Sequence, residues 1–287
     1  VFNLVTADGG VTWYGYEEVK NTLQQPSTLW AWGANDGGYG QPGNLGLNNT
    51  TQYSSPVQIP GTTWATIGSS TYFAVSKGAV KTDGTLWMWG SNANGRMGQN
   101  RSYSPNYKAY SSPVQIPGTT WSSTKGHLHV SSSALAIKTD GTLWAWGYND
   151  PGGLGLNNTT TYSSPVQVPG TTWDYVMTFG GSSAAVKTDG TLWSWGYNNL
   201  GMLGHNNQTQ YSSPKQVPGT NWSKIWLNET VGCGLKTDGT AWMWGRNSQK
   251  GQQGHNNLTD YSSPKQVPGN YIWLDINNYN AAWIKEL

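Results

Sequence analysis

Two histidines two positions apart, His127 and His129, are the residues whose spacing most directly suggests chemistry. Side chains at positions i and i+2 of a strand point to the same face, so two imidazoles here could bind one metal ion. Zinc sites use three or four protein ligands, and no Asp, Glu or Cys stands at ligand spacing from the pair. We therefore expect no metal, no cofactor and no catalytic residue. Only hydrolysis that is abolished by substituting either histidine would point to an enzyme.

The remaining histidines and the cysteine fit a structural interpretation. Cys233 stands in GCGLK where a related segment has Ala184 in SAAVK, which favours a small buried residue. A nucleophilic cysteine would need a histidine and an orienting group that the pattern does not supply. His205 and His255 occupy a position that is held elsewhere in the chain by Leu47, Leu156 or Gln99.

Two further sets of polar residues recur along the chain. A Lys-Thr-Asp set could form a ring of ligand-binding pairs, but solvated hairpin tips explain it better; its lysines are Lys81, Lys138, Lys187 and Lys236. Asn-x-Thr sequons, such as the one at Asn49, matter as glycosylation sites only in a glycosylating host. Elsewhere they are turn residues.

The composition excludes some classes of function. Charged residues make up 10% of the chain, and 16 basic and 14 acidic residues are spread evenly. Nucleic-acid binders usually have a clustered basic face, so we expect no nucleic-acid partner. No stretch approaches the roughly 20 apolar residues of a membrane helix, so we expect no membrane insertion. The first residues lack a starting Met and the pattern of an intact signal peptide, which suggests a processed or partial product.

A nine-residue segment, TDGTLWAWG, occurs at 139–147 and recurs with small changes at 82–90, 188–196 and 237–245, with a shorter copy, STLWAWG, at 27–33. The first tryptophans of these segments lie 57, 57, 49 and 49 residues apart. Such spacing is typical of propellers, solenoids and arrays. A catalytic motif is needed once, so this repetition predicts architecture.

Each repeat reads as four short strands. The first begins at the Trp after a PGTT turn, the second is a small-residue run such as SAAVKT, the third is LWAWG and the fourth is SPVQVP. Asp-Gly between the second and third predicts a tight hairpin, because both residues accept positive φ. We therefore predict an all-β fold, a β-propeller of four-stranded blades.

The two tryptophans of each W-x-W segment should point to one face of their strand. We expect them to fill the space beside the Gly, Ala and Ser residues of the next blade, each burying about 150–250 Å². The predicted inter-blade packing residues are Trp30, Trp32, Trp87, Trp89, Trp144, Trp146, Trp193, Trp195, Trp242 and Trp244.

The two ends of the chain look complementary. The last segment, YIWLDINNYNAAWIKEL, supplies the first two strands of a unit, and the beginning supplies TLWAWG and SSPVQIP, the last two. Pairing them would close the ring and remove open sheet edges. We prefer five blades over residues 29–287, preceded by an extension at 1–28. That extension resembles part of a repeat, so a sixth, degenerate blade is the alternative.

The repeat resembles the regulator of chromosome condensation repeat over about residues 27–287. The likeness rests on the small-residue strand, D-G, L-W-x-W-G, then NNLGMLG at 198–204 and S-P-x-Q-V. The family fold is a β-propeller, usually seven-bladed, and this chain has too few units for seven. Members include a chromatin-binding nuclear guanine-nucleotide exchange factor and secreted bacterial inhibitors of enzymes. The resemblance implies a protein-binding or ligand-binding scaffold. The near-identical units look most like repeats in extracellular or virus-encoded marine microbial proteins, including tail-fibre-like adhesins.

The best functional signal is where repetition breaks. The first two units carry five additional residues in the loop between strands three and four and three more between strands one and two. Both loops of a meander emerge on the same side, so the insertions should cluster over neighbouring blades. Tyr and Arg are enriched in binding surfaces. The candidate partner-binding residues are Tyr39, Arg101, Tyr103, Tyr107, Lys108, Tyr72, His127 and His129.

We therefore expect a non-enzymatic recognition or adhesion module, extracellular or on a virion, that binds a cell-surface partner through inserted loops. The partner would be a protein or a cell-surface glycan, and a homo-oligomer or larger assembly is left open. One alternative is a multivalent lectin with one sugar site per blade, built from Trp and Asn-Asn-Thr. Another is a structural or enzyme-inhibiting protein-binding scaffold.

Overall fold

The computed structural model describes residues 3–6, 13–16, 27–35, 43–70, 76–101, 109–248, 251–270, 273–276 and 281–284. Within these residues the fold is all-β, and the one helix is a single 3-10 turn, η1 (Ala93–Gly95). No described helix is long and apolar enough to cross a membrane.

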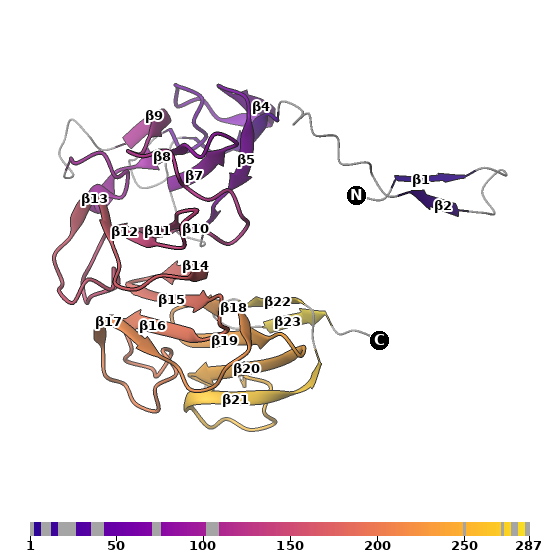
Figure 1. Cartoon of the computed structure of the whole chain (residues 1–287), viewed down its shortest axis with the longest axis vertical. Coiled ribbons are helices and arrows are strands. Elements are labelled where there is room, and N and C mark those ends of the chain that lie inside the picture. The colour runs from indigo at the N-terminus through magenta and orange to yellow at the C-terminus, as the bar shows by residue number, and fades with distance from the viewer. Residues whose placement is uncertain are drawn as a thin grey trace.

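Four complete blades follow one another along the chain, and each is an antiparallel meander (Figure 1). The first blade contains β5 (Trp64–Ile67), β7 (Ser76–Lys81), β8 (Leu86–Ser91) and β9 (Ala109–Gln115). The second contains β10 (Leu128–Val130), β11 (Ser133–Ile137), β12 (Leu143–Gly147) and β13 (Tyr162–Gln167), with β6 (Ser69–Ser70) added in parallel beside β10. The third contains β14 (Trp173–Phe179), β15 (Ser182–Lys187), β16 (Leu192–Gly196) and β17 (Tyr211–Gln216). The fourth contains β18 (Trp222–Leu227), β19 (Val231–Lys236), β20 (Thr240–Gly245) and β21 (Tyr261–Asn270).

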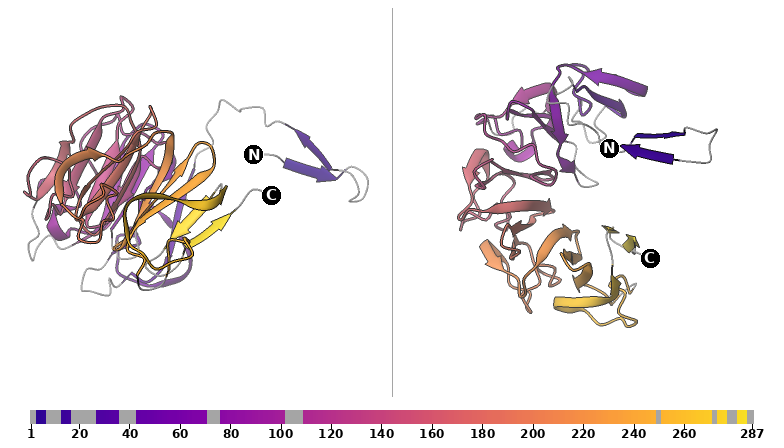
Figure 2. Two further views of the ribbon diagram at one scale, coloured as in Figure 1. Left: turned by 90° about the horizontal axis from the view of Figure 1, so that it is seen from below. Right: turned by 45° about the vertical axis from the view of Figure 1, so that its right-hand side comes forward.

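The blades follow one another around an arc, and each end of this arc is a half-blade (Figure 2). β3 (Leu29–Gly33) and β4 (Tyr53–Ile59) are the third and fourth strands of a unit, and β22 (Trp273–Ile276) and β23 (Ala281–Ile284) are the first and second. Each pair is a separate two-stranded sheet, and the pairs lie at opposite ends of the arc (Figure 2). The predicted pairing between them is therefore not seen among the described strands, and closure and blade count stay predictions. A hairpin of β1 (Asn3–Thr6) and β2 (Trp13–Tyr16) lies apart from the arc (Figure 1).

The predicted hairpin between strands two and three is present in every complete blade, but its geometry differs from the expectation. In the third blade Gly190 has a φ of +75°, whereas Asp189 is not among the residues with positive φ. The aspartate contributes its side chain instead: its Oδ1 accepts hydrogen bonds from the backbone N–H and the hydroxyl of Thr191, at 2.9 Å and 2.7 Å. Asp-Gly-Thr therefore works as an Asx turn followed by one left-handed glycine.

The W-x-W segments pack differently from the prediction. Ala134 and Ala136 are the cross-strand partners of Trp146 and Trp144, so the small residues make room for the indoles inside the same blade. Across the seam between blades, Trp146 belongs to one core cluster with larger apolar residues of the preceding blade, such as Met88. Antiparallel pairing places opposite residues on the same face, which explains why large and small residues alternate within a blade.

In the four complete blades the second tryptophan also forms a hydrogen bond across the seam to the preceding unit. Nε1 of Trp146 donates to the backbone oxygen of Arg96, and Nε1 of Trp195 donates to that of Gly153, both at 2.9 Å. Trp30 and Trp32 are 50% and 60% exposed, because their half-blade lacks the two strands that cover the equivalent residues elsewhere. In the complete blades the second tryptophan is buried and the first is half-buried, in contrast to Trp30 and Trp32. Cys233 is buried in the fourth blade, as its small-residue position predicted.

Candidate partner-binding face

The loop face is the side of the arc where the hairpins between strands one and two and the loops between strands three and four emerge. Its described hairpins are residues 131–132, 180–181 and 228–230, and its described loops are 34–35 with 43–52, 92–101, 148–161, 197–210 and 246–248 with 251–260. The Asp-Gly-Thr hairpins lie at the other end of the strands. Residues that recur from blade to blade, and residues that vary, can therefore be assigned to one end of the strands or the other.

Buried asparagines hold the loops of this face. In the third blade the Nδ2 of Asn198 donates to the backbone oxygens of Asn207 and Thr209, at 3.1 Å and 2.8 Å. Its Oδ1 accepts from the backbone N–H of Leu203 at 2.9 Å. Asn207, from the Asn-x-Thr segment, accepts from the N–H of Thr209 and donates to a backbone oxygen. The asparagines that a lectin would offer to a sugar are therefore engaged within the loop, and the lectin alternative gains no support from them.

The recurrent lysines and aspartates at the opposite end are engaged as well. Nζ of Lys187 lies 4.7 Å and 4.9 Å from the ring centroids of Trp173 and Trp193, within the range of a cation–π interaction. Hydrogen bonds from Thr191 lower the pKa of Asp189, with the nearby lysine adding to the effect. The other complete blades repeat this arrangement. These groups stabilise the hairpin, so their recurrence has a structural explanation.

Most of the predicted partner-binding residues lie outside the described part of the chain: Tyr39, Tyr72, Tyr103, Tyr107 and Lys108. Arg101 is described, lies on the loop face and is exposed. Its backbone oxygen accepts a hydrogen bond from Nδ2 of Asn92 at 3.3 Å. The role of this set in binding stays a prediction.

The three additional residues of the second blade do not lengthen its loop-face hairpin. Trp121 bridges Lys138, and the regular strand resumes only at Leu128, so the extra residues form a bulge at 123–126 inside the first strand. The N–H of Val176, in the next blade, donates to the backbone oxygen of Gly126 at 3.0 Å. The additional residues were expected on the loop face. In the second blade they instead lie within the first strand and contact β14, the first strand of the next blade.

His127 ends this bulge and connects the two blades. Its Nδ1 is 2.8 Å from Oγ of Ser122, and its Nε2 is 3.5 Å from Oδ1 of Asp174 on β14. Serine, histidine and aspartate are the residues of a hydrolase triad. Here the serine is 7% exposed, and its Oγ also accepts from the N–H of Thr124 at 3.3 Å. We interpret the set as a link between blades, with a nucleophile position that a substrate would reach poorly.

His129 lies inside the protein, away from the contacts of His127. It is 5% exposed, and burial lowers its pKa to about 4, so the imidazole is neutral at pH 7. Its Nδ1 accepts from the N–H of Thr178 at 3.4 Å. No group of three His, Cys, Asp or Glu residues is arranged to hold a metal in the described part of the chain. The two histidines therefore have separate, structural surroundings.

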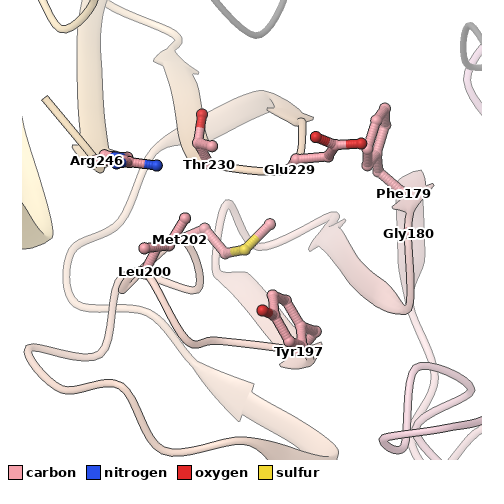
Figure 3. A pocket seen from close by; sticks show the side chains of 8 residues that line it. All are labelled: Phe179, Gly180, Tyr197, Leu200, Met202, Glu229, Thr230 and Arg246. Atoms are coloured by element: carbon pink, nitrogen blue, oxygen red, sulfur yellow. The ribbon is translucent and has the colours of Figure 1, made fainter. Parts of the chain in front are cut away.

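A cavity of about 330 Å³ opens on the loop face at the seam between the third and fourth blades (Figure 3). Each blade contributes one hairpin and one loop to it. The lining side chains are those of Phe179, Tyr197, Leu200, Met202, Glu229, Thr230 and Arg246, together with Gly180. The cavity thus combines an apolar base with four polar or charged groups.

At the three seams between the complete blades, one position of the repeat is occupied by three different residues. At the first seam it is Arg96, whose guanidinium donates to the backbone oxygen of Ser131 at 3.2 Å; burial lowers its pKa to about 10. At the second it is Gly153, where an added Cβ would lie 2.5 Å from the backbone oxygen of Gly181. At the third it is Met202. The first seam thus contains an arginine side chain, the second has close backbone packing, and the third has the cavity.

Sequence reasoning missed the residues of this cavity, although the sequence contained a signal. Arg246 follows W-G at a position held by Tyr148 and Tyr197 in the two preceding repeats. Met202 likewise stands where the two preceding repeats have Gly153 and Arg96. Insertions distinguish the first two units from the others. Substitutions at repeat positions, in units of equal length, distinguish the third seam.

The family comparison agrees with the repeat pattern. Residues 140–181 and 189–226 match the model of the regulator of chromosome condensation (RCC1) repeat. These segments span the second, third and fourth blades from the Asp-Gly hairpin of one to the first strand of the next.

Three solved structures share the fold. The chain is similar to human WBSCR16, with 19% identity and a TM-score of 0.67 over 87% of this chain and 65% of that one. It is similar to yeast RCC1 (Prp20), in the structure with Kap60 bound, with 19% identity and a TM-score of 0.64 over 86% and 62%. For Prp20p from Saccharomyces cerevisiae the values are 18%, 0.67, 91% and 66%. The chain spans slightly less than two thirds of each, and these likenesses show the fold. The chain carries RCC1-type repeats that form β-propeller blades.

Proposed function

We propose that this chain is a non-enzymatic recognition module that binds a protein partner through the loop face. The observation that carries the proposal is the cavity at the third seam. It opens on the loop face and is lined by residues that depart from the repeat pattern, among them Met202 and Arg246. The tryptophans, lysines, aspartates and asparagines that recur in each complete blade make contacts within the chain, and the aspartates do so at exposed hairpins. Recognition therefore falls to the variable residues of the loop face.

The solved structures support a protein as the class of partner. Yeast RCC1 (Prp20) has been crystallised with Kap60 bound, and Prp20p is described with binding properties to Gsp1p and histones. These are properties of those proteins, at 18–19% identity to this chain. They favour a protein ligand over a glycan for a propeller of this repeat type. The adhesion role and the location at a cell or virion surface stay proposals that come from the sequence resemblance alone.

A binding screen with substitutions on opposite faces tests the proposal. The purified chain is applied to intact microbial cells, to the same cells after protease treatment, and to a glycan array. The loop-face variant combines Arg101→Glu, Asn199→Arg and Arg246→Glu, which change exposed or cavity-lining residues of three loops. The control is Thr171→Glu, an exposed residue in the turn at the other end of the strands.

We expect binding that protease treatment removes, that the loop-face variant loses and that the control keeps. Binding of several equivalents of a sugar, unaffected by the loop-face changes, would replace the proposal with a lectin. The non-enzymatic part has its own test in Ser122→Ala. An esterase or peptidase activity that this substitution abolishes would show that the Ser122–His127–Asp174 set is catalytic.

A further inference from the structure

The frame of the seam cavity is fixed by one hydrogen bond between its two blades and by others within the fourth blade. Nε1 of Trp244, in the fourth blade, donates to the backbone oxygen of Met202, in the third, at 2.7 Å. Within the fourth blade, the N–H of Arg246 donates to the backbone oxygen of Thr230 at 2.8 Å. Asn228 caps the same hairpin by accepting from the N–H of Val231 at 2.7 Å. The cavity is thus largely pre-formed, as binding pockets usually are.

The size and lining of the cavity suit part of a peptide. About 330 Å³ lies at the lower end of the range of roughly 300–1,000 Å³ for ligand pockets, enough for one apolar side chain and a neighbouring polar group. Phe179 and Leu200, which are half-buried, supply most of the accessible apolar surface, whereas the lining residue Met202 is only 1% exposed. The occupant should therefore present an aliphatic side chain.

The charged groups add a second requirement. Arg246 lies beside Leu200, whereas Glu229 lies beside Phe179, so the two charges are on opposite sides of the opening (Figure 3). A guanidinium binds a carboxylate through two parallel hydrogen bonds, which gives direction as well as affinity. The position of Arg246 is a tyrosine in the two preceding repeats, so this cation is specific to the third seam.

We propose that the cavity between the third and fourth blades binds a short peptide segment of the protein partner, with an aliphatic side chain against Leu200, close to Met202, and an adjacent carboxylate on Arg246. This inference rests on the proposed function and names the chemistry recognised at its site. Glu229, on the other side of the opening, disfavours a second acidic residue there.

Methyl NMR with defined peptides tests the inference on the full chain. The chain has five methionines, and the methyl signal of Met202 is the one missing from a Met202→Leu variant labelled with ¹³C-methyl methionine. The probe is acetyl-Gly-Leu-Glu-Gly-amide. The matched probes are acetyl-Gly-Leu-Gln-Gly-amide, without the carboxylate, and acetyl-Gly-Ser-Glu-Gly-amide, without the aliphatic side chain.

We expect the first probe to move the Met202 methyl signal saturably, with a Kd near 1 mM, which corresponds to about 4 kcal/mol. Each matched probe should bind at least tenfold more weakly. Arg246→Gln should abolish the difference between the Glu and Gln probes, while Lys215→Gln, on the outer strand β17, should leave it unchanged.

Two results would overturn the inference. One is that none of the probes moves the Met202 signal, and the other is that the Glu and Gln probes bind equally well. If cell binding is still lost in the loop-face variant, the proposed function stands and only the peptide chemistry fails. If that variant also binds normally, both fail.

Discussion

Replacing the buried asparagine Asn198 by alanine tests whether one side chain fixes a whole loop of the binding face. Asn198 is 0% exposed and makes three hydrogen bonds, to the backbone oxygens of Asn207 and Thr209 and from the N–H of Leu203. Alanine leaves all three backbone groups without this partner in a place where water reaches poorly. The loop also carries Leu200, so its loss would disturb the seam cavity.

The expected cost follows from the number of bonds. A net contribution of about 1 kcal/mol for each hydrogen bond gives ~3 kcal/mol for the three. A change of 1 kcal/mol lowers the Tm of chains of 150–250 residues by roughly 2–4 °C. This chain has 287 residues, so we take the lower value and expect a fall of ~6 °C.

Two measurements distinguish a loss of overall stability from a local opening of the loop. Urea unfolding followed by tryptophan fluorescence gives the change in the free energy of unfolding, and hydrogen exchange gives the protection of the Leu203 amide. Asn199→Ala is the matched control, because Asn199 is exposed and its one described hydrogen bond is from the side chain of Gln210. We expect the control to change stability by less than ~0.5 kcal/mol. If Asn198→Ala behaves like Asn199→Ala and the Leu203 amide stays protected, the asparagine does not hold the loop.

Three further perturbations test the seam, the aromatic cluster and a buried histidine. Gly232→Ala would place a methyl 2.3 Å from Nε1 of Trp244, so we expect a loss of ~2 kcal/mol in urea unfolding; an unchanged midpoint would mean that the seam can relax. Lys187→Met removes the ammonium between two indoles, and we expect ~1 kcal/mol of destabilisation that Lys187→Arg largely avoids. Burial lowers the pKa of His205 to about 4, whereas an unfolded histidine titrates near 6.5. The unfolded chain therefore binds the additional proton between these values, stability should fall as the pH drops from 6.5 towards 4, and His205→Leu should flatten this part of the curve.

The repeat made the blade predictable because each of its signals is local. Asp-Gly-Thr, the W-x-W spacing and Pro-Gly each determine a turn or a face within a few residues, and they place all four strands of a unit. The direction of the tryptophan packing was predicted less well. Trp146 could face small residues of its own blade or of the next, and only the pairing of Ala134 with Trp146 shows which arrangement occurs.

The candidate site was less predictable because seams are made by residues far apart in the sequence. Nε1 of Trp146 donates to the oxygen of Arg96, 50 positions earlier. The bulge at 123–126 is another example, because a length difference between Trp121 and Lys138 does not say where the extra residues leave the strand. A cavity between two blades depends on the size of side chains on both, which a single repeat does not contain.

The seam position shared by Arg96, Gly153 and Met202 shows how a repeat protein can keep its structure while its binding properties change. In each case the backbone oxygen of this residue accepts the hydrogen bond of the next blade's tryptophan, at 2.9, 2.9 and 2.7 Å. A backbone acceptor is the same for every residue type, so the bond itself does not depend on the side chain, although close packing against the backbone of Gly181 leaves room only for glycine at the second seam. The first seam thus has an arginine, the second a glycine in close contact with the next blade's backbone, and the third a methionine beside the cavity. Because the structural bond and the variable side chain belong to one residue, substitutions at Arg96 or Met202, where the seam has room for a side chain, can alter recognition at one seam and keep the hydrogen bond that joins the blades.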